Sequence, residues 1–286
     1  MMLSLLACLL LAPDGPRVKP ESLGTFDAKL IPEASGVVRS RTRPGVFWVH
    51  NDSGNLPVLF AVDRRGRTLR AFPAAVPNLD WEDVAADGRG RIYVGDIGDN
   101  KGFLRLRSIH RFDEPDPDHP PEGPLKPSAS IHYARGPGDF FNAEGFVIDG
   151  DRAVIVVKRF DGRDPDLRAV ALEPPAPIAD PARVEKVGVL PGFPEAVTGA
   201  DLSPDGERFV ACGTKVVRVY ERPAPPSWDG LRMIAEVRLK GKAQREGVAW
   251  DGDDLILVAE GEGVERLAES VWRSRPPGTG KTSKDR

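Results

Sequence analysis

Four Asp-Gly pairs, each set between two apolar segments, constrain the fold of this chain more than any other feature. They are Asp87-Gly88, Asp149-Gly150, Asp205-Gly206 and Asp251-Gly252. In each repeat a short polar pair opens the first apolar segment, and the Asp falls five residues after the first member of that pair. An Asp-Gly pair between apolar segments is a strong β-hairpin signal. A fifth segment, residues 34–52, follows the same pattern without the Asp-Gly pair, so the sequence predicts five related hairpins.

The hairpins recur at intervals of 46 to 62 residues, and two further strand-like segments fill the intervals between them. Intervals of about 50 residues with four strands each are typical of β-propellers, in which each repeat forms one blade. We therefore predict an all-β fold, a β-propeller of five four-stranded blades, with a sixth degenerate blade as the alternative. Too few residues follow the last hairpin to complete its blade. The N-terminal segment GTFDAKLIP, residues 24–32, is expected to supply the missing outer strand and close the ring.

The ends of the chain differ from the repeat region. Residues 3–12 form an apolar run of signal-peptide length, too short to span a membrane. Within it, LLAC is similar to a bacterial lipobox, in which Cys8 would be lipidated. We predict a leader and linker at 1–20, a single propeller domain at 21–272 and a disordered tail at 273–286. We therefore expect the protein to be exported to the periplasm, the cell surface or the medium. Contact with the membrane is expected only through a lipid anchor at Cys8. The alternative interpretation of residues 3–12 is a frayed apolar terminus with no role in export.

Composition and motif content disfavour several classes of function. The net charge is -3 and no basic stripe carries interleaved aromatic residues, so nucleic acid is not an expected partner. The four histidines include no pair with zinc-ligand spacing, and the G-x-S-x-G turn of serine hydrolases is absent. We expect a monomer that acts on a small-molecule or anionic substrate, or that binds a partner in the cell envelope.

The opening pairs of the repeats carry acidic residues that a propeller would gather around its axis. The first strand of each blade lines the channel, and the second strand ends on the same face. The candidate metal ligands are the acidic and amide residues at these positions and in the loop after residue 96: Asp52, Glu82, Asp96, Asp99, Asn100, Glu144, Asp201 and Glu246. Carboxylates in a narrow channel need raised pKa values or a bound cation, and oxygen ligands favour calcium. The alternatives are a solvated acidic rim and, for Asp99 and Asn100, a role only in folding the loop.

The motifs ASG, NDSG, DWED, GDIGDN, EG and TGAD occur in this order between about residues 33 and 260. In this respect the chain resembles a family of exported bacterial β-propeller proteins. More loosely it is similar to phytase-like and to paraoxonase or gluconolactonase-type propellers, which carry calcium at the channel mouth and hydrolyse phosphoesters, esters or lactones. The resemblance implies a calcium site at positions already named: Asp52, Glu82, Asp96, Glu144, Asp201 and Glu246. Those enzymes typically have six blades and catalytic histidines, and neither is matched here.

Two functions of different classes follow from these observations. The first is a calcium-dependent hydrolase, in which Glu144 or Glu246 activates water and Lys158 holds an anionic substrate group. The second is a non-catalytic binding or scaffold propeller of the cell envelope, in which calcium only ties the blades together. A deep, partly apolar funnel around the acidic residues would favour the enzyme, and a closed channel would favour the scaffold.

Overall fold

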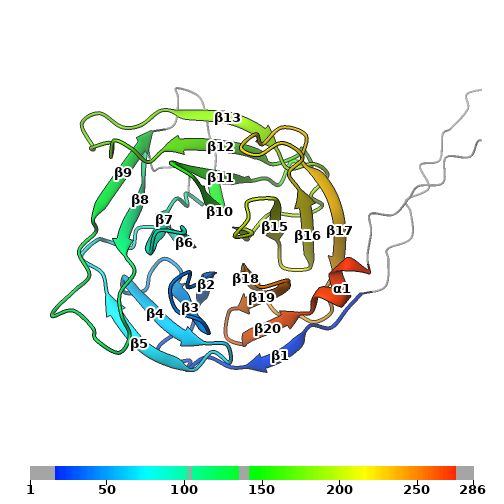
Figure 1. The fold of residues 1–286 in the computed structure, drawn as a ribbon, viewed down its shortest axis with the longest axis horizontal. Coiled ribbons are helices and arrows are strands. Elements are labelled where there is room, and N and C mark those ends of the chain that lie inside the picture. Colours follow the sequence, from blue (N-terminus) through cyan, green and yellow to red (C-terminus); the bar gives the residue numbers. More distant parts are fainter. Residues whose placement is uncertain (1–16, 101, 103–104, 135–141, 275–286) are drawn as a thin grey trace, which may run out of the picture.

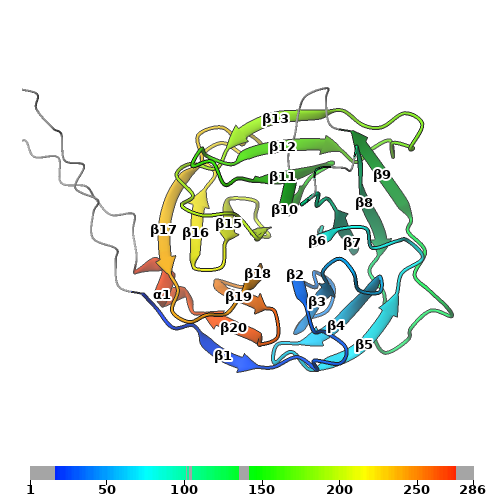
Figure 2. The same cartoon turned by 180° about the vertical axis from the view of Figure 1, so that it is seen from behind.

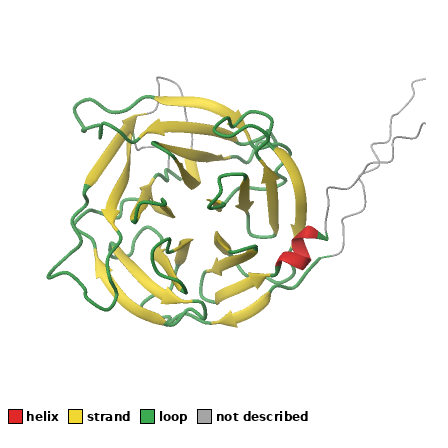
Figure 3. Ribbon diagram, in the orientation of Figure 1, coloured by secondary structure: helices red, strands yellow, loops and turns green. Residues whose placement is uncertain are grey.

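The computed structural model describes residues 17–100, 102, 105–134 and 142–274. The proposed leader with Cys8 and nearly all of the proposed tail lie outside these residues. The described chain forms five antiparallel sheets of four strands, arranged in a ring around one axis (Figure 1). Within the described residues, helix is confined to one short segment (Figure 3). The prediction of an all-β propeller with five four-stranded blades is confirmed.

Each blade is a meander whose first strand lies nearest the axis, and both views of the molecule show β2, β6, β10 and β18 there (Figures 1 and 2). The first strands are β2 (Ala34–Arg39), β6 (Trp81–Ala86), β10 (Asn142–Asp149), β14 (Gly199–Leu202) and β18 (Arg245–Asp251). The second strands are β3 (Val46–Asn51), β7 (Arg91–Asp96), β11 (Arg152–Lys158), β15 (Arg208–Cys212) and β19 (Asp254–Ala259). The third strands are β4 (Val58–Asp63), β8 (Leu106–Asp113), β12 (Asp166–Ala171), β16 (Val216–Glu221) and β20 (Gly263–Leu267). The outer strands of blades 1 to 4 are β5 (Thr68–Pro73), β9 (Ala129–Ala134), β13 (Val184–Val189) and β17 (Arg232–Arg238).

The N-terminal segment closes the ring. Strand β1 (Glu21–Gly24) pairs antiparallel with β20 and becomes the outer strand of blade 5. The N-terminal segment therefore closes the ring, as expected. The closing strand is residues 21–24 (ESLG), however, and lies just before the predicted segment, residues 24–32. Val18 extends the junction by bridging to Leu239, next to the outer strand of blade 4. Because the first and last parts of the chain share one sheet, blade 5 has four strands like the other blades and the ring is closed.

Apolar layers between neighbouring blades form the core. Five clusters of buried side chains each join residues of two adjacent sheets, and together they run around the ring. Aromatic residues anchor these layers; Trp250 of blade 5, for example, packs edge-on against Trp272 with ring centroids 5.8 Å apart. Trp272 belongs to the only helix in the described residues, α1 (Glu269–Arg273). None of the described helical structure is long or apolar enough to cross a membrane.

The hairpin turns differ in one detail from the prediction. Asp149 pairs with Arg152 and Asp251 pairs with Asp254, so each of these Asp residues is the last one of its strand. The two turn residues are therefore Gly-Asp, with Gly150 and Gly252 at a φ of 65°. Glycine accepts this left-handed conformation without steric cost, which is why the Asp-Gly signal still locates the turn correctly. We call the end of the ring that carries these turns the turn face.

The inner strands of neighbouring blades approach one another closely around the axis. A Cβ atom on Gly199 of blade 4 would lie 2.8 Å from the Cα of Gly247 of blade 5, and one on Gly247 would lie 3.0 Å from the carbonyl carbon of Gly36 of blade 1. Asp83 of blade 2 accepts hydrogen bonds from the backbone of blades 3 and 4. Glycine therefore permits the close approach of the blades, and Asp83 links three of them near the axis.

Candidate functional site

Three glutamates occupy equivalent bulges at the start of the inner strands. The register of β6 with β7 shifts between Trp81 and Asp83, which leaves Glu82 unpaired in the ladder. The same shift occurs around Glu144 in β10 and around Glu246 in β18. A bulge inserts one extra residue and redirects its side chain, and bulges are common beside functional sites. Here they belong to the ends of the strands opposite the turn face, and we call this end of the channel the acidic mouth.

Seven carboxylates and one ammonium group contribute to the electrostatics of the acidic mouth, because each is either a carboxyl group with a raised pKa or a charge that acts on one. The carboxylates are those of Glu33, Asp52, Asp80, Glu82, Glu144, Glu246 and Glu260, and the ammonium group is that of Lys158. They come from blades 1, 2, 3 and 5 and from the loops that precede or follow the strands of these blades. Burial combined with so many like charges strongly favours either protonation or a bound cation.

Asp52, Asp80 and Glu82 form the tightest group of the mouth. Each offers one carboxylate oxygen, and these atoms all lie within 4.8 Å of one another. Glu82 is only 5% exposed, and its Oε1 atom has no hydrogen-bond partner among the described residues. A buried carboxylate oxygen without a donor is costly, so its position needs a ligand or a proton to explain it.

The backbone at Gly98 leaves room beside these carboxylates. A Cβ atom there would overlap Oε1 of Glu82 and would lie 2.5 Å from Oδ2 of Asp80. The loop is held in place because the Gly98 N–H donates to the carbonyl oxygen of Asp80 at 3.1 Å. Asp96 supports the same region, since its Oδ1 accepts a hydrogen bond of 2.7 Å from the Asp80 N–H. Asp96 therefore positions Asp80.

The electrostatics of this group fit a hard divalent cation. Burial raises the pKa of Glu82 well above its ordinary value, and the charges of Glu144, Asp52 and Asp80 add to this shift. Burial likewise raises the pKa of Asp52. Oxygen ligands placed about 2.4 Å from one calcium ion are separated by at most twice that distance, which matches the spacing here. All three donors are carboxylate oxygens, the type that calcium prefers.

Lys158 and Glu144 act on the charges of the three-carboxylate group, and Glu246 interacts in turn with both of them. The Lys158 ammonium forms an ion pair with Oε1 of Glu144, and it lies 5.5 Å from the centroid of the Phe160 ring. Burial raises the pKa of Glu144, while Lys158 opposes that shift. Burial, together with the charge of Glu144, raises the pKa of Glu246 to about 8. A carboxyl group that titrates near neutral pH beside a fixed ammonium group is suited to proton transfer.

The structure places the remaining predicted ligands outside this group. Asp99 forms an ion pair of 2.8 Å with the buried Arg107, and its N–H donates to the side chain of Asn142. The same Asn142 donates to Oδ1 of Asn100 at 2.9 Å. Asp99 and Asn100 thus take part in an ion pair and in hydrogen bonds that hold the loop after β7 against blade 3 and Arg107. A role in folding this loop was the alternative to metal binding for both residues.

Asp201 does not join the acidic mouth. Its carboxylate accepts backbone hydrogen bonds of 2.8 Å from Leu202 and from Trp250, and Arg41 lies 3.6 Å away. Burial raises the pKa of Asp201 to about 6, and Arg41 opposes the shift. Strand β14 has a continuous register with β15, and in this blade the position of Glu82 is held by Ala200, while Asp201 corresponds to Asp83. Asp201 instead ties blade 4 to blade 5 and borders the turn face.

Sequence reasoning missed Asp80 and Gly98. Asp80 stands two residues before Glu82, as Glu33 stands two residues before Ser35 of the first repeat. An acidic residue at this offset in two repeats was a signal that could have added Asp80 to the candidates. Gly98 lies in the GDIGDN motif, but only the folded backbone shows how close it comes to the carboxylates.

Comparisons with known proteins add no assignment to this geometry. No protein-family model matches the sequence, and no curated protein matches it. The structure itself shows a β-propeller of five blades.

Proposed function

We propose that this protein binds one calcium ion at the acidic mouth through Asp52, Asp80 and Glu82. The observation that carries the proposal is the buried, unpartnered Oε1 of Glu82, which lies within 4.8 Å of oxygen atoms from the two other carboxylates. Gly98 supports it, because any larger residue there would fill the space next to the same two oxygen atoms. The donor set is hard and anionic, as calcium requires.

We further propose that the mouth hydrolyses a phosphoester, ester or lactone. When bound, calcium would polarise the carbonyl or phosphoryl oxygen of the substrate. Glu246 in its ionised form would take a proton from the attacking water, and would then return it to the leaving oxygen. Lys158 would stabilise negative charge on the substrate, and Glu144 would hold the Lys158 ammonium through their ion pair.

A panel of phosphoester, ester and lactone substrates, assayed with calcium and with EDTA, tests the hydrolase. We expect calcium-dependent turnover that falls by roughly 100-fold or more in Glu246→Gln, because a positioned general base contributes on that order. Glu262→Gln is the matched control, since Glu262 is an exposed carboxylate in the turn between β19 and β20. Equal activity of the two variants, or no turnover on any substrate, would contradict the catalytic proposal.

The second candidate is a binding or scaffold propeller with structural calcium, and the close contacts between the inner strands favour it. Gly36, Asp83 and Gly247 bring the backbones of the blades close together around the axis. For this candidate, calcium would raise the melting temperature while every substrate of the panel stayed intact. Export is a further proposal that rests on the apolar leader sequence; mass spectrometry of the protein recovered from the native host would identify the mature N-terminus.

A further inference from the structure

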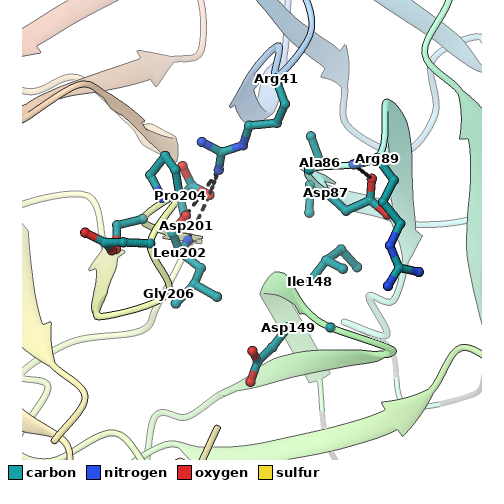
Figure 4. Close-up of a pocket in the computed structure, with 15 residues that line it drawn as sticks. Arg41, Ala86, Asp87, Arg89, Ile148, Asp149, Asp201, Leu202, Pro204 and Gly206 are labelled. Carbon is teal, nitrogen blue, oxygen red and sulfur yellow. Dashed lines mark hydrogen bonds and ion pairs between the residues drawn. The ribbon is translucent and has the colours of Figure 1, made fainter. Parts of the chain in front are cut away.

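A second hollow, separate from the acidic mouth, lies at the axial end of the turn face (Figure 4). Its volume is about 450 Å³, within the range of small-molecule sites. The turns of blades 2, 3 and 4 form its wall, and blade 1 contributes Arg41. None of the three carboxylates of the proposed calcium site lines this hollow.

The four aspartates in this wall are already paired within the protein, Asp201 with Arg41 and Asp205 with Ser203 and Arg208. Asp87 accepts hydrogen bonds from Arg91 at 2.6 Å and from the Tyr93 hydroxyl at 3.0 Å. Asp149 accepts hydrogen bonds of 2.8 Å from both Arg222 and the Trp228 indole. Their charges are therefore offset by neighbours in the wall and do not call for a cationic ligand.

Two arginines line the hollow; Arg89 is exposed, whereas Arg41 is largely buried and is held by contacts with the opposite wall. Its side chain reaches from blade 1 toward Asp201 and Leu202 of blade 4 (Figure 4). There Nη2 donates to the Leu202 carbonyl oxygen at 3.2 Å and lies 3.6 Å from Asp201. The side chain is only 14% exposed, yet Nε and Nη1 have no acceptor within the described part of the chain. A guanidinium group fixed at one nitrogen, with two donors left over, is preorganised to bind a carboxylate.

Small apolar side chains complete the wall next to this guanidinium group. Ala86, Ile148, Leu202 and Pro204 line the same hollow. We propose that the hollow is a binding site for a small organic monocarboxylate, whose carboxylate pairs with Arg41 and whose apolar body lies against Ile148 and Leu202. This site is distinct from the proposed calcium site and does not depend on it.

Benzoate is a suitable probe, with uncharged benzamide as its matched analogue. Both are titrated by NMR in EDTA, so that any metal at the acidic mouth is removed. We expect benzoate to bind with a dissociation constant on the order of a millimolar and to shift the Arg41 Nε–Hε signal together with the methyl signals of Ile148 and Leu202. The methyl signals of Leu56 and Leu79, which lie in loops on the acidic-mouth face, should stay in place.

Two variants distinguish specific binding at Arg41 from nonspecific attraction of the anion to positive charge on the protein. Arg41→Met should weaken benzoate binding roughly tenfold or more, because it removes a charge-assisted contact. Arg67→Met removes an equal charge from an exposed turn on the same face and should leave binding unchanged. Equal binding of benzoate and benzamide, equal effects of the two variants, or no shift at Ile148 would overturn the proposal. The wild-type shifts decide the question even if Arg41→Met fails to fold.

Discussion

At the residue scale, the acidic mouth is defined by the buried carboxylate of Glu82. Its Oε1 atom lacks a protein donor, while Asp52 and Asp80 place two further oxygen atoms within 4.8 Å. In the absence of a cation, repulsion and burial both work against ionisation of Glu82. Such an arrangement lowers the free energy of unfolding, and binding of a cation to the folded protein would raise it again.

Gly98→Ala tests whether the space beside these oxygens is needed. The new Cβ would overlap Oε1 of Glu82, so we expect calcium affinity to fall by roughly tenfold or more. Gly88→Ala is the matched control, because a Cβ on Gly88 meets no atom within 4 Å and its φ is not in the left-handed region. Calorimetric titration of both variants provides the comparison. Unchanged affinity of Gly98→Ala would place the ion elsewhere.

At the scale of the strands, bulges and glycines explain how five blades meet around one axis. The bulges in β6, β10 and β18 turn three glutamates toward one mouth. Just beyond the bulges the inner strands come so close that a Cβ on Gly199 or Gly247 would press on the backbone of the next blade. The same short segments therefore build the site and set the width of the ring.

Gly199→Ala is expected to destabilise the fold. Its Cβ would lie 2.8 Å from the Cα of Gly247, and backbone atoms of a packed strand can move only at a cost. Overpacking of this kind lowers the free energy of unfolding by about 1–3 kcal/mol. Urea denaturation should show a lower midpoint for Gly199→Ala than for Gly88→Ala. Identical midpoints would mean that the blades are not in contact at this level.

At the scale of the whole molecule, the ring was predictable from sequence because its signals are local and repeated. Hairpin turns such as Asp87-Gly88 and their regular spacing depend on short stretches of chain, and these give the blade count. The closing strand was placed a few residues too late, since GTFDAKLIP is as strand-like as the ESLG that pairs with β20.

The composition of the site was less predictable because it depends on bulges and on contacts between blades. Glu82 and Asp201 both belong to opening pairs, and sequence alone placed them at one mouth. Glu82 is the first member of its pair and lies at a bulge, whereas Asp201 is the second member and accepts backbone hydrogen bonds, as Asp83 does in blade 2. Asp80 was missed because it precedes its strand, at a position that the repeat pattern does not include.

The pH dependence of stability is a second property of the whole molecule. Burial and the charge of Glu144 raise the pKa of Glu246 from 4.5 to about 8. The folded protein therefore holds this proton more tightly than the unfolded chain does, and the stability that the proton confers is lost as the pH rises from 4.5 through 8. In EDTA, the melting temperature of Glu246→Gln minus that of the wild type should increase across this range. A difference that stays constant with pH would contradict the raised pKa.

Calorimetric titration of EDTA-treated protein with calcium, alongside its melting temperature, tests the central claim most directly. We predict one ion per chain and a higher melting temperature with calcium, both lost in Glu82→Gln and both kept in the exposed control Glu262→Gln. Glu82→Gln should also melt higher than the wild type in EDTA at pH 8, because it removes a buried carboxylate whose ionisation is unfavourable. Absence of calcium binding by the wild type, with a melting temperature that calcium leaves unchanged, would contradict the account.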